Sequence, residues 1–311
     1  MAAASATAPA VSSDAQSGSK RAARTLPGTA VAAAGTAIAA PVSLQGIGRA
    51  FASQGGQRQV LRDIDLEIAA GEIVAILGPS GCGKSTLLRI AGGLDRPTQG
   101  EALIGGEPVK PFDARSAVGF QEPRLLPWRT IANNVALGLP RGTPRTAGRE
   151  QVSRLLDLVG LADFADHRPR EVSGGMAQRT SLARALARNP AVLLLDEPFG
   201  ALDALTRLKM QDLLLDVHAA EPATILLVTH DVDEALQLAD RVILLGHDDD
   251  PAAAPGAIVT QTIVVPGHRP RDRGSAELAE LRGRLLDGLG IDRHGAARGI
   301  ETGTTIPHYP Y

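Results

Sequence analysis

A glycine-rich segment contains the residue types that bind phosphate, and it matches the pattern G-x-x-x-x-G-K-[ST]. Glycines let backbone N–H groups converge on phosphate oxygens without a clash from a Cβ atom. We expect Lys84 to reach the β- and γ-phosphates of a nucleotide and Ser85 to offer a hydroxyl to Mg²⁺. The residues predicted to bind ATP are Gly78, Pro79, Ser80, Gly81, Cys82, Gly83, Lys84, Ser85 and Thr86, which we call the phosphate loop.

Two carboxylates, Asp196 and Glu197, follow the apolar run 192–195. In a protein with a phosphate loop, the first carboxylate after such a strand binds Mg²⁺ directly or through water. The next carboxylate faces the terminal phosphate and can orient or deprotonate the attacking water. We therefore predict Asp196 as the metal partner and Glu197 as the general base. For the pair taken alone, a solvated pair of acids at a strand end is the alternative.

The chain has one cysteine, Cys82, inside the phosphate loop. A single cysteine excludes an internal disulfide framework and a cysteine-based zinc site. Because the sequence offers no partner thiol, we expect Cys82 to be a small filler rather than a redox switch.

The elements that must position these groups alternate between buried strands and helices. A β-branched run at 73–77 precedes the phosphate loop, and residues 84–91 follow it with a helical pattern. Further apolar runs alternate with helical stretches. The sequence therefore predicts an α/β fold with a mostly parallel sheet. These runs are 192–195, 224–228 and 242–245, and the helical stretches are 205–218 and 233–239.

Two regions differ from this alternation. Residues 42–44 and 60–68 have the short or alternating patterns of strands ahead of the core. From about 124 to 188, apolar residues recur at helical spacing and we find no strand pattern, so we predict an all-helical insert.

Composition excludes some classes of protein. The 311 residues have a net charge of −2, which gives no overall basic field for nucleic acid, and aromatic residues make up only 3%. We therefore expect no nucleic-acid partner. No stretch approaches the 18 or so consecutive apolar residues of a membrane span.

The two ends of the chain have different compositions. The alanine-rich residues 1–40 offer little large apolar surface, so we expect a disordered extension, with a signal peptide as the alternative. Residues 251–311 are predicted to be a C-terminal extension with a β-element at 257–265 and a helix at 275–289. We expect the basic stretch Arg269–Arg273 to be solvated, the alternative being a phosphate site.

Several further motifs resemble those of ABC transporter ATPases. The segment 172–179 (VSGGMAQR) is similar to their L-S-G-G-x-x-Q-R motif, and Gln121, Ala201–Asp203 and His230 lie where the family has its Q-loop, D-loop and switch histidine. The order and spacing match from about residue 42 to 246. The resemblance implies a P-loop NTPase (RecA-like) core with a β-subdomain and the all-helical insert, which makes residues 41–250 the ATPase domain.

The resemblance also implies roles for these residues. Ser173, Gly174 and Gly175 would face the γ-phosphate of an ATP bound by a second subunit, so two identical chains would form a homodimer with two ATP molecules at the seam. His230 would hydrogen-bond the γ-phosphate and hold Glu197 in place. Gln121 would reach Mg²⁺ or the attacking water. The predicted catalytic residues are thus Glu197, His230, Gln121 and Lys84. Ser173, Gly174 and Gly175 are predicted to bind the nucleotide, and Ser85, Gln121 and Asp196 are the predicted metal site.

Phe51 lies upstream of the phosphate loop, where the family stacks an aromatic ring on adenine. A phenylalanine keeps the π-face that such stacking needs. The alternative is that Phe51 is a core residue.

Residues 121–135 (QEPRLLPWRTIANNV) resemble the segment after the Q-loop in the ATP-binding subunits of importers of nitrate, taurine and aliphatic sulfonates. They are most similar to that segment in the sulfonate group. That resemblance implies a peripheral subunit on the cytoplasmic face of the bacterial inner membrane. Its partners would be two permease subunits and, indirectly, a periplasmic sulfonate-binding protein. Import of taurine, nitrate or another oxyanion stays open, as does a non-transport ABC ATPase. Trp128 would either anchor the permease or pack inside the helical insert.

Overall fold

The computed structural model describes residues 1, 38–53, 56–248 and 254–291. The chain divides into two compact units, Met1–Gly35 and Thr36–Tyr311, and every element below belongs to the second. The predicted disordered extension lies almost wholly outside the described residues, as do residues 292–311.

A six-stranded sheet forms the centre of this unit, in the order β10-β9-β3-β8-β7-β6. Five of the strands are parallel, and β10 pairs antiparallel with β9. The inner strands consist mostly of leucine, isoleucine and valine and are almost fully buried, as expected for strands covered on both faces. The strands are β3 (Ile73–Leu77), β6 (Ser116–Gly119), β7 (Val192–Asp196), β8 (Thr224–Val228), β9 (Arg241–Gly246) and β10 (Ile258–Val264).

A smaller antiparallel sheet, in the order β2-β1-β4-β5, forms the β-subdomain. Its apolar side chains share one core cluster with helix α1 (Lys84–Ala91) and one face of the central sheet. The sequence patterns did not predict β4 or β5, because these strands alternate weakly and carry glycine and glutamate. The four strands are β1 (Val42–Ser53), β2 (Gly56–Ile68), β4 (Gln99–Ile104) and β5 (Glu107–Pro108).

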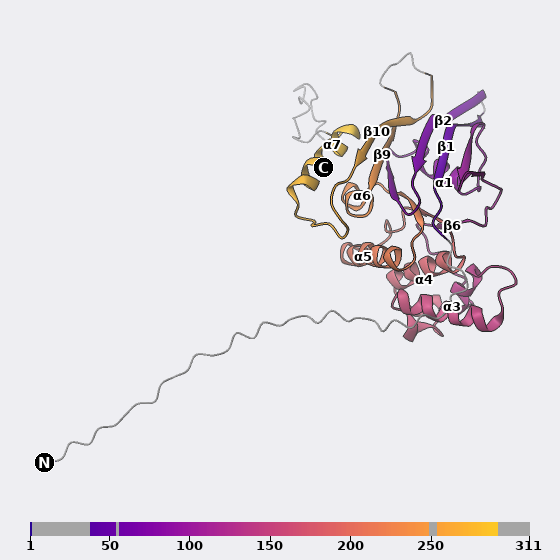
Figure 1. The fold of residues 1–311 in the computed structure, drawn as a ribbon, viewed down its shortest axis with the longest axis vertical. Helices are drawn as coiled ribbons and strands as arrows, with labels where there is room; N and C mark the ends of the chain where they lie inside the picture. The colour runs from indigo at the N-terminus through magenta and orange to yellow at the C-terminus, as the bar shows by residue number, and fades with distance from the viewer. Residues whose placement is uncertain (2–37, 54–55, 249–253, 292–311) are drawn as a thin grey trace, which may run out of the picture. The chain divides into compact units, whose positions relative to one another are not determined.

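Helices cover the opposite face of the central sheet. Helix α5 (Ala204–Ala220), helix α6 (Val232–Leu238) and helix α7 (Ala276–Gly288) share a second core cluster with that face. Helix α7 lies beside β10 (Figure 1). Residues beyond 257 thus add an edge strand and a packed helix to the same compact unit.

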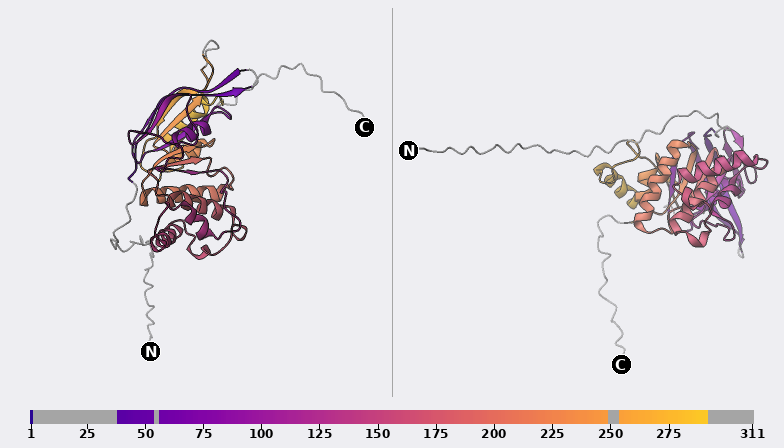
Figure 2. Two further views of the ribbon diagram at one scale, coloured as in Figure 1. Left: turned by 90° about the vertical axis from the view of Figure 1, so that its right-hand side faces the viewer. Right: turned by 90° about the horizontal axis from the view of Figure 1, so that it is seen from below.

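The region between β6 and β7 is entirely helical, as predicted. Figures 1 and 2 show its helices gathered at one end of the unit, next to α5. The helices are α2 (Ile131–Val135), α3 (Arg145–Leu158) and α4 (Gly174–Ala187), joined by the 3₁₀ turns η1 (Ala136–Gly138), η2 (Ala162–Phe164) and η3 (Pro169–Glu171). The predicted α/β fold, with its mostly parallel core, β-subdomain and helical insert, is therefore confirmed.

Candidate functional site

The phosphate loop connects the end of β3 to the first turn of α1. Two of its glycines are required by close approaches of the chain. A Cβ atom on Gly78 would lie 2.3 Å from the carbonyl oxygen of Leu245, and one on Gly83, whose φ is +103°, would lie 2.7 Å from Leu61. The loop can therefore fold tightly against β9 and β2 while its N–H groups and the positive end of α1 stay available to an anion.

Lys84 places a positive charge within this loop. Its Nζ donates hydrogen bonds to the carbonyl oxygens of Gly78 (2.8 Å) and Pro79 (2.9 Å). The side chain is almost fully buried, and these two carbonyls offset part of its lost hydration. The ammonium group is thus held beside the loop's N–H groups, which is the arrangement that phosphate oxygens require.

Ser85 and Asp196 meet at the carboxyl end of β7. The Ser85 hydroxyl donates a 2.8 Å hydrogen bond to Oδ1 of Asp196, so a neutral and an anionic oxygen lie side by side. An all-oxygen pair of this kind suits Mg²⁺, which takes few protein ligands and completes its shell with water and phosphate oxygens. Among the described residues, no group of three or more His, Cys, Asp or Glu side chains forms a fuller metal cage.

Glu197 follows Asp196 with a left-handed backbone, φ +48°. Its N–H donates to the carbonyl of Val228 (2.9 Å), which fixes the end of β7 against β8. Two residues beyond Val228, the Nδ1 of His230 lies 3.4 Å from Oε2 of Glu197. Parallel pairing of β7 with β8 therefore brings together two residues that lie far apart in the sequence.

These groups border a cleft of about 1,120 Å³, which we call the nucleotide cleft. Six residues of the phosphate loop line it, together with Glu197 and residues from β1 and β2. Gly78, Pro79 and Cys82 do not line it. The lining residues are Phe51, Ala52, Ser53, Arg58, Val60, Ser80, Gly81, Gly83, Lys84, Ser85, Thr86 and Glu197.

Cys82 points away from the cleft. It is 2% exposed and packs in the core cluster beneath the β-subdomain, where burial raises the pKa of its thiol. A buried, protonated thiol is a poor nucleophile, which agrees with the prediction that Cys82 is a filler.

Phe51 lies at the wall of the nucleotide cleft with 38% of its surface exposed, so the alternative that it is a core residue is wrong. The guanidinium of Arg49 lies 4.2 Å from the centre of its ring. Arg58 pairs with Phe51 across β1 and β2 and also lines the cleft. The sequence analysis missed Arg58, although a basic residue opposite an aromatic one on neighbouring strands was the available signal.

Ser173, Gly174 and Gly175, which we call the signature segment, begin helix α4 and do not line the nucleotide cleft. The Ser173 hydroxyl accepts a hydrogen bond from the N–H of Met176 (3.3 Å) and caps the helix. Gly174 is exposed and Gly175 is half-buried. A Cβ on Gly175 would lie 2.6 Å from Thr206, so this segment adjoins the start of α5.

Gln121 follows β6 and is exposed. A Cβ on Gly200 would lie 3.1 Å from the Gln121 amide nitrogen, which places this side chain against the turn after Glu197. The structure therefore brings Gln121 close to the Glu197 turn but not into the lining of the nucleotide cleft.

A second groove, of about 260 Å³, lies between the central sheet and the helical insert. Its wall includes Leu94, Phe112 and Phe120, and Phe112 is 76% exposed. Trp128 does not line this groove, but it is 68% exposed, so the alternative that it packs inside the helical insert is wrong. The buried Asn134 side chain bonds the backbone on both sides of Trp128: it accepts from the Leu126 N–H and donates to the carbonyls of Leu126 and Arg129. The tryptophan ring stays outside this hydrogen-bonded segment.

The expectation of a solvated stretch at 269–273 holds for Pro270, Asp272 and Arg273, which are exposed, and is wrong for Arg271. Arg271 is 8% exposed, and its guanidinium donates to the carbonyls of Leu236 (3.1 Å) and Gln237 (3.2 Å) at the end of α6. Arg269 donates to Leu238 (3.1 Å). Arginines that bond the last carbonyls of a helix cap it, so this stretch fastens α6 rather than binding phosphate.

Comparisons with known proteins agree with this geometry. A family model described as ABC transporter matches residues 61–200. The chain is 48% identical to an aliphatic sulfonates import ATP-binding protein of Mesorhizobium japonicum, over 85% of this chain and 99% of that protein. It is 49% identical to a protein of the same description from Streptomyces avermitilis, over 85% of this chain and 92% of that protein.

Solved structures give the same result. An ATP-binding cassette solved as a dimer in a post-hydrolysis state, bound to ADP and Pi, has a TM-score of 0.61 to this chain. The two are 33% identical, and the match covers 73% of this chain and all of that one.

Proposed function

This chain belongs to the ABC transporter family of ATP-binding proteins, and we propose that it is the ATP-hydrolysing subunit of an importer of aliphatic sulfonates. The observation that carries the proposal is that the phosphate loop and Glu197 line one cleft, with His230 3.4 Å from the Glu197 carboxylate. The choice of sulfonate follows from the description of the two relatives given above. ATP does not select the cargo, so no residue of the nucleotide cleft is assigned to the sulfonate.

ATP would bind with its phosphates over the phosphate loop. Loop N–H groups, the N-terminus of α1 and the Lys84 ammonium would surround the β- and γ-phosphate oxygens. Adenine would stack on the Phe51 ring, whose other neighbour is the Arg49 guanidinium. In this pose the γ-phosphate would lie toward Glu197, which also lines the cleft.

Ser85 and Asp196 would hold Mg²⁺, with Gln121 as a further ligand reached by movement of its loop. The ion, when bound, neutralises charge on the β- and γ-phosphates. The neighbouring hydroxyl and carboxylate oxygens of Ser85 and Asp196 fit this donor preference.

Glu197 would accept the proton of a water molecule that attacks the γ-phosphorus in line with the leaving oxygen. The nearby His230 imidazole would hydrogen-bond the γ-phosphate and limit the positions that the Glu197 carboxylate adopts. The attack forms a new P–O bond and breaks the bond to the β-phosphate oxygen, which yields ADP and phosphate.

A second copy of the chain would complete the site. The signature segment presents a helix N-terminus, with Ser173 and Gly174 exposed, outside the lining of its own nucleotide cleft. In a head-to-tail homodimer it would cover the γ-phosphate bound by the partner chain. Closure of the two copies on ATP and reopening after hydrolysis would then drive the transporter.

The permease would dock in the groove lined by Leu94, Phe112 and Phe120, and the exposed Trp128 would be a further anchor. Among the described helices, none has the length and apolar character needed to cross a bilayer. We therefore propose that the chain sits on the cytoplasmic face of the membrane through its permease subunits, and that a periplasmic binding protein delivers the sulfonate to them.

Growth of a deletion strain tests the cargo. Without the gene, we expect no growth on an alkanesulfonate as the sole sulfur source and normal growth on sulfate. A plasmid with the wild-type gene should restore growth, and one with Lys84→Ala should not. Normal growth of the deletion strain on alkanesulfonates, in a background without a second importer, would contradict the sulfonate assignment. Loss of growth on taurine or nitrate alone would transfer the assignment to that anion.

A further inference from the structure

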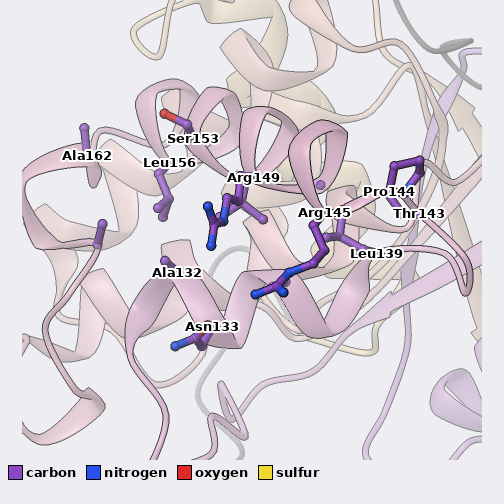
Figure 3. A pocket seen from close by; sticks show the side chains of 14 residues that line it. Ala132, Asn133, Leu139, Thr143, Pro144, Arg145, Arg149, Ser153, Leu156 and Ala162 are labelled. Carbon is purple, nitrogen blue, oxygen red and sulfur yellow. The ribbon is translucent and has the colours of Figure 1, made fainter.

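The helical insert contains a cavity of about 440 Å³ that the proposed ATPase cycle does not use. It lies between α3 on one side and α2 with η1 on the other (Figure 3). Its volume falls in the range of small-molecule sites. We call it the α3 cavity, and its apolar wall consists of Ala132, Ala136, Leu139, Val152, Leu156, Ala162 and Ala165.

Two arginines border this apolar wall. Arg145 and Arg149 are one turn apart on α3, so their side chains emerge on the same face. Figure 3 shows both guanidinium groups extending from α3 toward α2, into the space beside Ala132 and Asn133. No acidic residue is among those that line the cavity.

Neither arginine has a carboxylate partner within the described part of the chain, whereas other arginines do. On the same helix, Arg154 forms an ion pair with Glu221, and elsewhere Arg207 pairs with Asp231 at 3.2 Å. The first turn of α3 also contains no acidic residue. The α3 cavity is thus apolar on one wall and has two uncompensated, fork-shaped cations at its rim.

We infer that the α3 cavity binds a small amphiphilic anion, namely an alkanesulfonate. The head group would accept paired hydrogen bonds from the guanidinium groups of Arg145 and Arg149, a geometry that suits planar arrays of anionic oxygens. The alkyl chain would lie against Val152, Leu156 and the alanines of α2. The inference rests on the proposed function only in the choice of sulfonate over another anionic head group. The fit of an amphiphilic anion follows from the apolar wall and the two arginines of the α3 cavity.

The cavity is connected to the site of hydrolysis through packed helices. Helix α3 packs on α4, and the Gln151 amide on α3 donates to the carbonyl of Ala187 at the end of α4 (3.1 Å). Val152 and Leu156 line the cavity and also belong to the core cluster that includes Leu182 and Leu186 of α4. A ligand in the α3 cavity would therefore contact the helix that stabilises the position of α4, whose first residues are the signature segment.

Calorimetric titration of the full-length chain with a series of alkanesulfonates tests this site. ADP and Mg²⁺ are kept at saturating concentration, so that the phosphate loop cannot bind the added anion. We expect 1:1 binding of octanesulfonate, and an affinity that rises about fourfold for each added methylene from butanesulfonate to octanesulfonate. Inorganic sulfate, which has no chain, and octanol, which has no charge, should each bind at least tenfold more weakly.

Variants then locate the binding. The double substitution Arg145→Gln and Arg149→Gln should weaken octanesulfonate at least tenfold, because both cations are exposed and their loss leaves the fold intact. Arg141→Gln is the matched control, since this arginine is exposed nearby but does not line the cavity. Ser153→Phe, at the cavity wall, should block the alkyl chain while both arginines remain.

Three outcomes would overturn the inference. These are equal affinity for sulfate and octanesulfonate, equal affinity in the double variant and the wild type, and no binding of octanesulfonate at millimolar concentration. Each can occur whether or not the growth test supports sulfonate import, because the titration measures binding to the isolated chain.

Discussion

The chain has two helix N-termini that are suited to phosphate, and they differ in how complete they are. The phosphate loop at α1 has its own cation in Lys84, the hydrogen-bonded pair Ser85 and Asp196 that we propose for Mg²⁺, and a cleft with the proposed general base Glu197 on its border. The signature segment at α4 has a capping serine, an exposed Gly174 and a half-buried Gly175, with no cation in its first turn.

The phosphate loop and the signature segment also differ in the elements that they pack against. The phosphate loop is joined to the buried strand β3 and packs against β9 and β2, so its geometry is set by the core of one chain. The signature segment belongs to the helical insert and adjoins the start of α5. Without a cation of its own, the signature segment would contribute to catalysis only when another surface supplies the phosphate. The difference between the phosphate loop and the signature segment therefore favours one γ-phosphate shared by both over two sites that bind phosphate independently.

The largest expected effect comes from the complete site. Lys84→Ala removes the positive charge from the loop and leaves the Gly78 and Pro79 carbonyls without their donor. We expect ATP binding to weaken at least ~100-fold and phosphate release to fall ~1,000-fold, because several kcal/mol of charge stabilisation are lost. Equilibrium binding of a fluorescent nucleotide and a phosphate-release assay measure the two effects. Lys110→Ala, an exposed lysine outside the cleft, is the control and should change neither.

The second prediction concerns Glu197, whose proposed role as general base affects hydrolysis but not ATP binding. Glu197→Gln keeps the shape of the side chain but cannot accept a proton, so phosphate release should fall ~100- to 1,000-fold while ATP affinity stays close to the wild-type value. Because hydrolysis would no longer reopen the pair, size-exclusion chromatography with ATP should show an accumulated dimer. Glu107→Gln, on an exposed strand, should leave the protein active and mostly monomeric. Turnover close to wild type in Glu197→Gln would remove this residue from the role of base.

The signature segment offers a sharper test, because capping and phosphate contact can be separated. Aspartate is as good a helix cap as serine, so Ser173→Asp should retain the melting temperature of the wild type. Its negative charge would repel the partner's γ-phosphate, and we expect phosphate release to fall ~10- to 100-fold with little change in ATP affinity.

Ser173→Ala is the matched variant. It removes the cap bond to Met176 and should cost about 1 kcal/mol of stability, while activity falls less than in Ser173→Asp. If Ser173→Asp hydrolyses ATP as fast as the wild type, the two loops do not share a phosphate and the comparison fails.

Local sequence was sufficient for the complete site and for the central sheet. The phosphate loop, the acidic strand end and the buried strands each depend on residues close together in the chain, and their spacing indicates their structure. Glu197 and His230 lie far apart in the sequence, and the parallel pairing of β7 with β8 brings them together. Their pairing and the role of the signature segment were therefore expected only from the resemblance to a family.

Features that depend on packing between distant elements were missed. The Arg269–Arg273 stretch has the composition of a solvated segment, and only the nearby end of α6 makes it a set of helix caps. The exposure of Trp128 depends on the buried Asn134, which bonds the backbone around it. Neither fact is encoded in the spacing of the segment itself.

The last predicted effect is on stability and concerns a buried carboxyl on α6. Glu234 is 3% exposed, and burial raises the pKa of its carboxyl to about 7, with Asp231 adding repulsion and Thr229 and Arg207 opposing it. Its Oε1 has no hydrogen-bond partner. Helix α6 follows His230 and packs on α5, which begins beside the signature segment.

The sign of its pH dependence follows from proton binding. Between pH 4.5 and about 7 the folded chain holds a proton on Glu234 that the unfolded chain has released, so the contribution of Glu234 makes stability fall as pH rises through this range and level off above it. Glu234→Gln is neutral at every pH and should lack this fall. Relative to the wild type, it should gain about 1–3 kcal/mol between pH 5 and pH 8, measured by urea unfolding.

Glu280→Gln, on the exposed face of α7, is the control and should follow the wild-type profile. Parallel stability profiles for Glu234→Gln and the wild type would show that the carboxyl is already ionised in the folded chain. Helix α6 would then contain a buried charge. Arg207, which pairs with Asp231 and has an unpartnered Nε, would be the first residue to test for the interaction that compensates this charge.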